Sequence, residues 1–423
     1  MKLLVNKTPL RRICEIEDIT LRQLYEKIDF LHQQVVRFSQ DREKKLDRCF
    51  RDQNAYFSTD IQTILVNWPV KNRRGTIPLL NMCTVHKFSQ FVVASTVDFD
   101  PKISPDEIEE FMNACADFDK PRSMRRHARL WAHSEYEDSL IRSQSTALSE
   151  DDLAVLGRLK LPGNGSRVRG DAFKYAHTML VKKLIGSDFK SANFCLDDEA
   201  GLAATVCSLN VDLINSGQVN VAEISFQKGL TNDDKQRLAN EGRALFEQAV
   251  AAEADNIARV REVYPSLTDM QAITLLMLWK NFREHSATDR AELFAQKGVP
   301  WPYHKKPEPM KAIRLKTDRG DMGWDDLARF FASATLHPVD AYFNFARRRI
   351  AGFERGIPTA ANSERIWHAY SYYSPAQVPK MVDILRFYYN YMLTSVEVDK
   401  QTPAMRLGLA RGKVYARDLI AFA

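Results

Sequence analysis

The sequence predicts an α/β protein whose mixed β-sheet is flanked by helices, and two stretches carry that prediction. Three segments between Tyr56 and Val97 are rich in β-branched and aromatic residues, which is typical of strands that follow one another in a meander. Between Ala192 and Phe226, two strand patterns enclose a helix pattern, which favours a parallel pair of strands. The 423 residues are enough for two or three domains of about 100–200 residues each.

The composition narrows the class of protein. With 45% hydrophobic and 27% charged residues, the chain has an ordinary globular composition, and its net charge of +6 is compatible with a polyanionic partner. The six cysteines form no C-x-x-C pair, so they indicate neither a zinc module nor a disulfide framework. No stretch approaches the ~18 apolar residues of a membrane span, and the N-terminus lacks the apolar segment of a signal peptide. We therefore expect a cytoplasmic protein without a membrane partner.

The N-terminal region, residues 1–52, has a helical pattern. Between Leu10 and Arg51, apolar residues recur at spacings that favour one face of a helix. Asp18 to Thr20 fits a turn and an N-cap before a second helix, so the pair could be a helix-turn-helix that binds DNA. A plain helical hairpin packed on the next domain is the alternative.

The first part of the sheet domain spans residues 53–228. Its first strand carries Asp60, and two further strands are predicted at Leu79–Val85 and Phe91–Val97, after a basic turn. Ser104, with Glu107 three positions later, marks the start of a helix. A lone acid on a strand is usually a solvated group, so Asp60 needs partners before it indicates a site.

A basic insertion lies within this domain at about residues 120–170. It interleaves arginines and histidines with Trp131, a combination that suits the backbone of a nucleic acid. A solvated helix face is the alternative. The candidate DNA-binding residues of the insertion and of the basic turn are Arg125, Arg126, Arg129, Arg167, Arg169, Arg73 and Arg74.

A second acidic position follows the strand predicted at Ala192–Leu196. Asp197 and Asp198 stand at its carboxyl end, just before a helix that begins near Gly201. Open α/β sheets place ligands and metals at this edge. Residues 229–330 then form a mostly helical insertion, with one more strand expected at Met310–Thr317.

The end of the domain, residues 331–423, contains a helix that Pro338 would begin. One face of this helix carries Asp340 together with Arg347 and Arg348, so the acid could hold a cation while the arginines hold phosphates. A surface helix with an Asp–Arg pair is the alternative. A later stripe of tyrosines at 388, 389 and 391 is more often part of a core than a platform for bases.

Several segments together resemble a known family. RFYYNYM followed by TPAMRLGLA, in the tail, resembles the end of the catalytic core of insertion-sequence transposases, which is similar to that of retroviral integrases. STDIQ around Asp60 is similar to the segment of that family that carries its first-strand acid. In the family, an apolar or aromatic residue follows the second acid five positions later. In LDDEAGL, Leu202 stands at this spacing from Asp197 but not from Asp198. VDAYFNFARRRIAGF resembles the helix of the third acid. The match runs from about Tyr56 to Ala410.

The resemblance implies a ribonuclease H-like core in which Asp60, Asp197 and Asp340 are the catalytic and metal-binding acids. Two Mg²⁺ or Mn²⁺ ions would be bound there, and Arg347, Arg348 and Arg349 would hold the DNA backbone. The third acid of the family is usually Glu, so Glu354 and Glu364 are alternatives to Asp340, and Asp198 is the alternative at the second position.

The same resemblance implies a DNA transposase. It would cleave the ends of a mobile element and join them to target DNA, acting as a homo-oligomer assembled on DNA. A catalytically inactive DNA-binding protein derived from a transposase, or a ribonuclease H-like nuclease, is the alternative.

Overall fold

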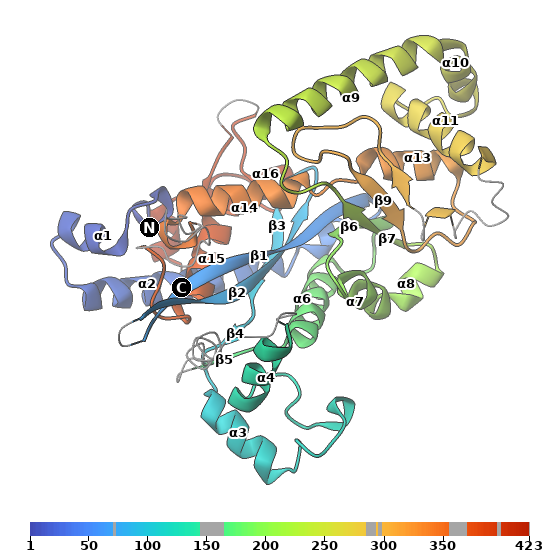
Figure 1. Ribbon diagram of the computed structural model, residues 1–423. Helices are drawn as coiled ribbons and strands as arrows, with labels where there is room; N and C mark the ends of the chain where they lie inside the picture. Colours follow the sequence, from blue (N-terminus) through green and yellow to red (C-terminus); the bar gives the residue numbers. More distant parts are fainter. Residues whose placement is uncertain are drawn as a thin grey trace.

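The computed structural model of the protein describes residues 1–70, 73–143, 165–284, 293–294, 298–354, 370–395 and 399–422 (Figure 1). Its centre is a seven-stranded sheet of order β3-β2-β1-β6-β7-β9-β8, and β4 and β5 form a separate two-stranded sheet. The strands are β1 (Asn54–Val70), β2 (Arg73–His86), β3 (Val92–Val97), β4 (Phe99–Asp100), β5 (Ser166–Arg167), β6 (Ser191–Asp197), β7 (Val219–Ser225), β8 (Val299–Pro300) and β9 (Ala312–Leu315).

The sheet is mixed, as the sequence predicts. Strands β1, β2 and β3 form the antiparallel meander, while β6 pairs in parallel with both β1 and β7. Strand β9 returns antiparallel to β7, close to the expected strand at residues 310–317. The α/β class and the parallel pairing of the two later strands are therefore confirmed.

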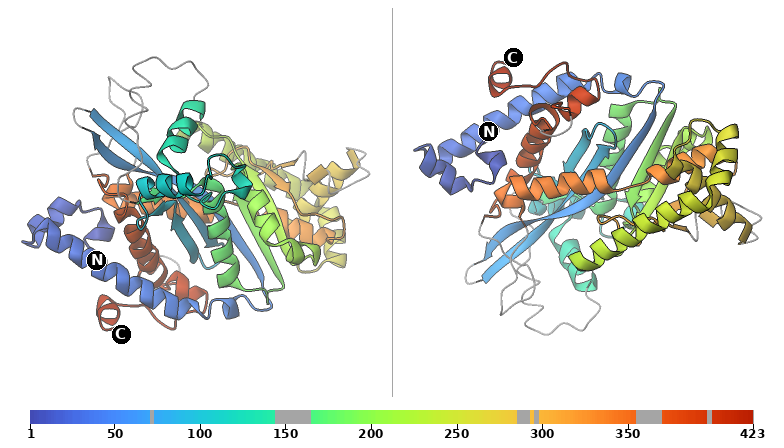
Figure 2. Two further views of the ribbon diagram at one scale, coloured as in Figure 1. Left: turned by 90° about the horizontal axis from the view of Figure 1, so that it is seen from below. Right: turned by 90° about the horizontal axis from the view of Figure 1, so that it is seen from above.

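Helices cover both faces of the sheet (Figure 2). On one face, Thr59 of β1 and Thr84 of β2 bond to each other, and Thr84 bonds to His177 of α6 (Gly170–Ile185). On the other face, Gln62 of β1 accepts a hydrogen bond from Arg347 of α14 (His337–Arg349). Because side chains alternate along a strand, Asp60 lies on the same face as Gln62, under α14.

The N-terminal helices are α1 (Leu10–Ile16) and α2 (Leu21–Glu43), and α2 begins with a capping box between Thr20 and Gln23. The second helix packs along α15 (Gln377–Phe387), where Phe38 contacts the rings of Phe387 and Tyr391. A buried ion pair of 2.9 Å joins Glu43 to Arg386. This is the arrangement of a packed hairpin, and DNA recognition by the pair stays a prediction.

The helical insertion stands at the end of the sheet beyond β9 (Figure 1). It contains α9 (Asn232–Ala252), α10 (Ala254–Val263) and α11 (Asp269–Glu284), where the sequence predicts helices, and also α13 (Trp324–Ser333), most of which falls within the expected helical insertion at residues 229–330. Trp324 packs against Trp279 and Phe282 of α11, which fixes α13 to the insertion.

A small lobe projects from the opposite side of the sheet and contains α3 (Pro105–Ala114) and α4 (His133–Ser143). The expected capping box of α3, between Ser104 and Glu107, is confirmed. Ile108, Met112 and Ala132 form a small core of their own in this lobe. The main hydrophobic core, by contrast, is one large cluster of buried side chains that includes residues of the N-terminal helices, the sheet and the tail.

The remaining elements are short and lie mostly at the ends of longer ones. Tyr391 is fully buried and Tyr389 packs on Tyr342, so the tyrosine stripe of the tail belongs to the core. None of the helices in the described ranges combines the length and the apolar character needed to cross a membrane. The short elements are α7 (Leu202–Leu209), α8 (Val211–Asn215), α16 (Pro403–Arg406), α17 (Ala416–Ile420), the 3₁₀ turns η1 (Leu4–Asn6), η2 (Asp47–Cys49), η3 (Arg122–Met124) and η5 (Ala351–Phe353), and the π-helical turn η6 (Tyr388–Met392).

Candidate active site

Asp60 and Asp197 lie on neighbouring parallel strands. The register of β1 and β6 pairs Ser58 with Cys195 and Thr59 with Leu196, and Asp60 and Asp197 are the next residues on the two strands. Neighbouring strands lie about 4.8 Å apart, so the two carboxylates stand side by side. The parallel pairing thus brings together two acids that are far apart in the sequence.

Asp340 joins them from above the sheet. It lies in the first turn of α14, which begins at His337 with Pro338 in the first turn, as the sequence predicts. Burial raises the pKa of Asp340 to about 6, and the negative charges of Glu308 and Asp197 add to this rise. The acid on the helix therefore lies within the electrostatic influence of the acid on β6.

Asp60 has the most strongly shifted carboxyl group of the three. Burial raises its pKa to about 7, and Asp197 and Asp340 contribute to this rise because their negative charges oppose a third. The backbone N–H of Ile61, which donates to Asp60 Oδ1 over 2.6 Å, acts in the opposite direction. Carboxylates that share one partly buried region in this way are typical of functional sites.

Lys228 is a site residue that the sequence reasoning missed. Its Nζ lies 3.3 Å from Asp197 Oδ2. Desolvation alone would lower the pKa of Lys228, but Asp197, Asp60 and Asp340 together outweigh that effect and raise it. The available signal was position, because Lys228 follows the carboxyl end of β7, at the edge where β6 presents Asp197.

The donor chemistry of the site suits a divalent cation. Carboxylate oxygens are the ligands that Mg²⁺ and Mn²⁺ prefer, and the Lys228 ammonium group shows that the acids attract a cation. Beside Asp60 on β1, Ser58 Oγ and Gln62 Nε2 are buried without a hydrogen-bond partner in the described residues, so they remain available to a ligand. Across the residues that the structure describes, no three His, Cys, Asp or Glu side chains are gathered closely enough to hold an ion by themselves.

The structure separates the three acids from their alternatives. The side chain of Asp198 is 46% exposed and forms an ion pair with Arg314, whereas that of Asp197 is 13% exposed and faces Lys228. Glu354 forms an ion pair of 2.9 Å with Lys7 of the N-terminal segment. Glu364 lies outside the described residues.

The three arginines at the end of α14 have different surroundings. Arg347 donates to Gln62 over 3.4 Å, and its charge lowers the pKa of Asp340, so it belongs to the site. Arg348 is exposed. Arg349 instead bonds to Asn6 and lies over the ring of Phe345, so it holds the N-terminal segment.

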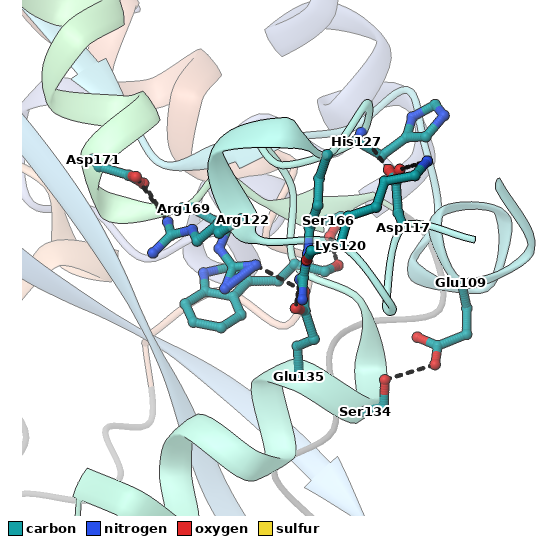
Figure 3. A network of polar contacts seen from close by, with 12 residues as sticks. Glu109, Asp117, Lys120, Arg122, His127, Ser134, Glu135, Ser166, Arg169 and Asp171 are labelled. Atoms are coloured by element: carbon teal, nitrogen blue, oxygen red, sulfur yellow. Dashed lines mark hydrogen bonds and ion pairs between the residues drawn. The ribbon is translucent and has the colours of Figure 1, made fainter. Parts of the chain in front are cut away.

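Three arginines of the basic insertion are engaged in ion pairs with acids of the protein, and Figure 3 shows one of them, Arg169, beside Glu135. Arg169 and Arg125 both form ion pairs with Glu135, and Arg169 also lies 4.2 Å from the ring centre of Trp131. Arg167 donates from Nε to Asp98 Oδ2 over 3.0 Å. Trp131 and these arginines therefore stabilise the lobe, which was not expected from their spacing.

The remaining predicted DNA contacts are placed differently. Arg126 and Arg129 are exposed on the small lobe, so they carry the DNA-binding hypothesis for this segment. Arg73 and Arg74 lie at the beginning of β2, opposite Val70 and Pro69 of β1.

Comparisons of the chain with protein-family models, with curated proteins and with solved structures find no significant match.

Proposed function

We propose that the protein is a DNA transposase that cleaves the ends of a mobile element and joins them to target DNA with the help of divalent cations. The observation that carries this proposal is that Asp60 and Asp197 hold adjacent positions on the parallel strands β1 and β6, while the charge of Asp340, in the first turn of α14, influences the pKa of Asp60. Phosphodiester chemistry needs little covalent work from the protein, but it needs positioned phosphate and neutralised charge.

The core would be ribonuclease H-like. In support of this, β3, β2 and β1 are antiparallel, and β6 and β7 then continue in parallel on the other side of β1. The resemblance implies that the first acid lies on β1, the second at the end of the next parallel strand and the third on a later helix. Asp60, Asp197 and Asp340 follow that order along the chain.

Three roles follow for the residues of the site. Asp60, whose carboxyl group is influenced by both other acids, would hold Mg²⁺ or Mn²⁺ ions together with Asp197 and Asp340, two ions being expected. When bound, the ions supply neutralisation of phosphate charge and activation of the attacking hydroxyl group. Lys228 and Arg347 add positive charge beside the acids and would hold the scissile phosphate for in-line attack by water or a DNA 3′-hydroxyl, as the bond to the leaving oxygen breaks.

A second candidate is a DNA-binding protein derived from such an enzyme but inactive as a nuclease. The ion pair between Lys228 and Asp197 favours it, because the ammonium group is located where a cation would be bound. The two candidates differ in whether a divalent cation can bind at the acids in competition with the ammonium group of Lys228.

Substitution of Asp60 tests the proposal. We expect Asp60→Asn to reduce divalent-dependent cleavage and joining of DNA ends to background, because the amide cannot bridge two cations, while DNA binding and folding stay nearly intact. Asp198→Asn is the matched control, since Asp198 is exposed and paired with Arg314, and it should retain activity. Full activity of Asp60→Asn in an assay of strand cleavage on gels would contradict the assignment.

A readout independent of activity separates the two candidates. A ligand that binds only the folded protein at 100 times its Kd stabilises it by about 2.7 kcal/mol. Mg²⁺ or Mn²⁺ should therefore raise the melting temperature of the wild type and of Asp198→Asn, but not of Asp60→Asn. No rise in the wild type would favour the inactive DNA-binding protein.

A further inference from the structure

A cavity lies near the acids, where the end of β2 meets α13 and the start of α14. It has a volume of about 510 Å³, which is within the usual range of ligand pockets. Three lysines line it, together with the aromatic rings of Phe88 and Trp301. We call this cavity the lysine pocket; the three lysines are Lys87, Lys305 and Lys311.

The lysine pocket has an excess of positive charge. Glu308 is the one acidic residue among the described residues that line it, and it lies 3.1 Å from the Nζ of Lys311. Glu308 also accepts hydrogen bonds from the backbone N–H of Leu336 and the hydroxyl group of Thr335. One carboxylate, already satisfied by these contacts, therefore faces three ammonium groups.

Lys87 is a partly buried lysine of the pocket whose ammonium group contacts a backbone carbonyl and an aromatic ring. Its Nζ donates to the carbonyl of Ser333 over 2.9 Å and lies 5.2 Å from the ring centre of Phe88. Burial lowers the pKa of Lys87 to about 8, and the charges of Lys305 and Lys311 contribute to this fall. The charge of Glu308 acts in the opposite direction without cancelling this fall, and no ion pair joins Lys87 to a carboxylate of the described residues.

A buried ammonium group without a counter-ion is costly, and an anion in the cavity would remove that cost. We propose that the lysine pocket binds a phosphate ester. A phosphate carries up to two negative charges and several acceptor oxygens, so it can bind two or three ammonium groups at once. The rings of Phe88 and Trp301 add an apolar wall that suits the base of a nucleotide.

The position of the lysine pocket indicates where the phosphate would come from. His337 and Pro338 line the pocket, and Asp340 lies one turn further along the same helix. Glu308 contributes to both places, because it lines the pocket and raises the pKa of Asp340. A DNA strand held at the acids would thus continue into the pocket, and this assignment to DNA rests on the proposed function. A free nucleotide is the other source of the same chemistry.

Protection of the lysines from acylation tests the proposal. The protein without divalent cation is treated with trace acetic anhydride at pH 8, and acetylation of Lys87 and Lys305 is followed by mass spectrometry. The probes are a short DNA duplex with a single-stranded end, and ATP. We expect the DNA to slow acetylation of both lysines at least fivefold, and Lys306, which is exposed and outside the pocket, to be much less affected.

Two variants complete the test, since Lys305 and Lys306 are both exposed and their loss should leave the fold intact. Lys305→Ala should weaken DNA binding and reduce the slope of log K against log salt by about 1, whereas Lys306→Ala should change the affinity less than about twofold. Protection by DNA supports the assignment to a DNA phosphate.

Protection by ATP alone supports a phosphate site but overturns its assignment to DNA. Protection by neither probe overturns the proposal. Because no cleavage is required, a protein that fails the cleavage assay but shows protection by DNA would refute the proposed enzyme and leave the lysine pocket in place.

Discussion

Lys228 is the side chain that most changes the balance of charge around the three acids. With its ammonium group at Asp197 and with Arg347 near Asp340, two positive charges face three carboxylates. The net charge of these five groups is therefore negative. Because the pKa of Asp60 is raised to about 7, partial protonation of Asp60 near neutral pH makes this net charge smaller in magnitude. A site with this balance attracts cations, which is a prerequisite for a metal-dependent enzyme.

Lys87 leads to a prediction about stability and pH. Its pKa in the folded protein is lowered to about 8 from 10.5, so its contribution to stability is present above pH 10.5 and is lost as the pH falls through 8. Lys87→Met should therefore be more stable than the wild type at pH 7, by about 1–3 kcal/mol, and the gain should largely disappear near pH 10.5. Urea unfolding at both pH values measures this. An equal gain at both would indicate packing rather than charge.

Arg167, unlike Lys87, forms an ion pair with a buried carboxylate. It is bound to Asp98, a carboxylate that is 1% exposed and also accepts a hydrogen bond from the backbone of Leu80. Arg167→Ala should lower the free energy of unfolding by about 3–5 kcal/mol, because it leaves a buried acid unpaired. Arg129→Ala, at an exposed position, should change it by less than about 0.5 kcal/mol.

Denaturant unfolding of the two variants gives the comparison. A further variant, Arg167→Ala with Asp98→Ala, should recover part of the loss, since no buried charge remains. Unchanged stability of Arg167→Ala would show that the ion pair is dispensable and that the arginine is free to bind DNA.

At the scale of elements, α14 combines a structural face with a functional one. Tyr342 and Phe343 are buried, Tyr342 packs on Tyr389, and the helix as a whole contacts β1 and β2, which holds Asp340 over the sheet. The same helix then presents Arg347 towards Gln62 and Arg348 towards the outside. Helical periodicity explains why these residues divide between two faces.

The arginines of α14 should contribute to DNA binding without reading its sequence. Arg347→Ala with Arg348→Ala should weaken binding to all DNA sequences alike and reduce the slope of log K against log salt by about 2, because two phosphate contacts are lost. Arg349→Ala is the control on the same helix, since Arg349 bonds to Asn6. Filter binding at several salt concentrations measures the slope. An unchanged slope in the double variant would show that this face does not meet DNA.

At the scale of the whole molecule, the N-terminal region is part of the core. Ile28, Val35 and Phe38 of α2 are buried in the same cluster as the sheet. An ion pair between Glu43 and Arg386 and a hydrogen bond between His32 and Asp383 join α2 to α15. The region therefore depends on the sheet domain for its packing, and the sheet domain depends on it.

Removal of residues 1–52 should consequently prevent cooperative folding of the rest, because it exposes the apolar face of α15. The point substitution Phe38→Ala should lower the free energy of unfolding by about 3–5 kcal/mol. Thermal unfolding followed by circular dichroism tests both. A fragment of residues 53–423 that unfolds cooperatively at the wild-type temperature would show that α2 is dispensable.

Much of the fold is readable from neighbouring residues alone. The β-branched runs predict the meander, Ser104 and Glu107 predict the start of α3, and Pro338 predicts the start of α14. These features depend on backbone preferences and on contacts within a few positions, which a sequence displays directly. The three candidate acids depend on more than these local features, because the resemblance to insertion-sequence transposases is what singles out Asp60, Asp197 and Asp340.

Contacts between distant residues decided the rest. Asp197 and Asp198 are adjacent in the sequence, but Asp198 meets Arg314, 116 positions later, while Asp197 meets Lys228. The basic insertion looks like a DNA surface until Glu135 and Asp98 are placed beside its arginines. Charge pairing and desolvation depend on which side chains the topology brings together, and β1, β6 and α14 meet only in the folded chain.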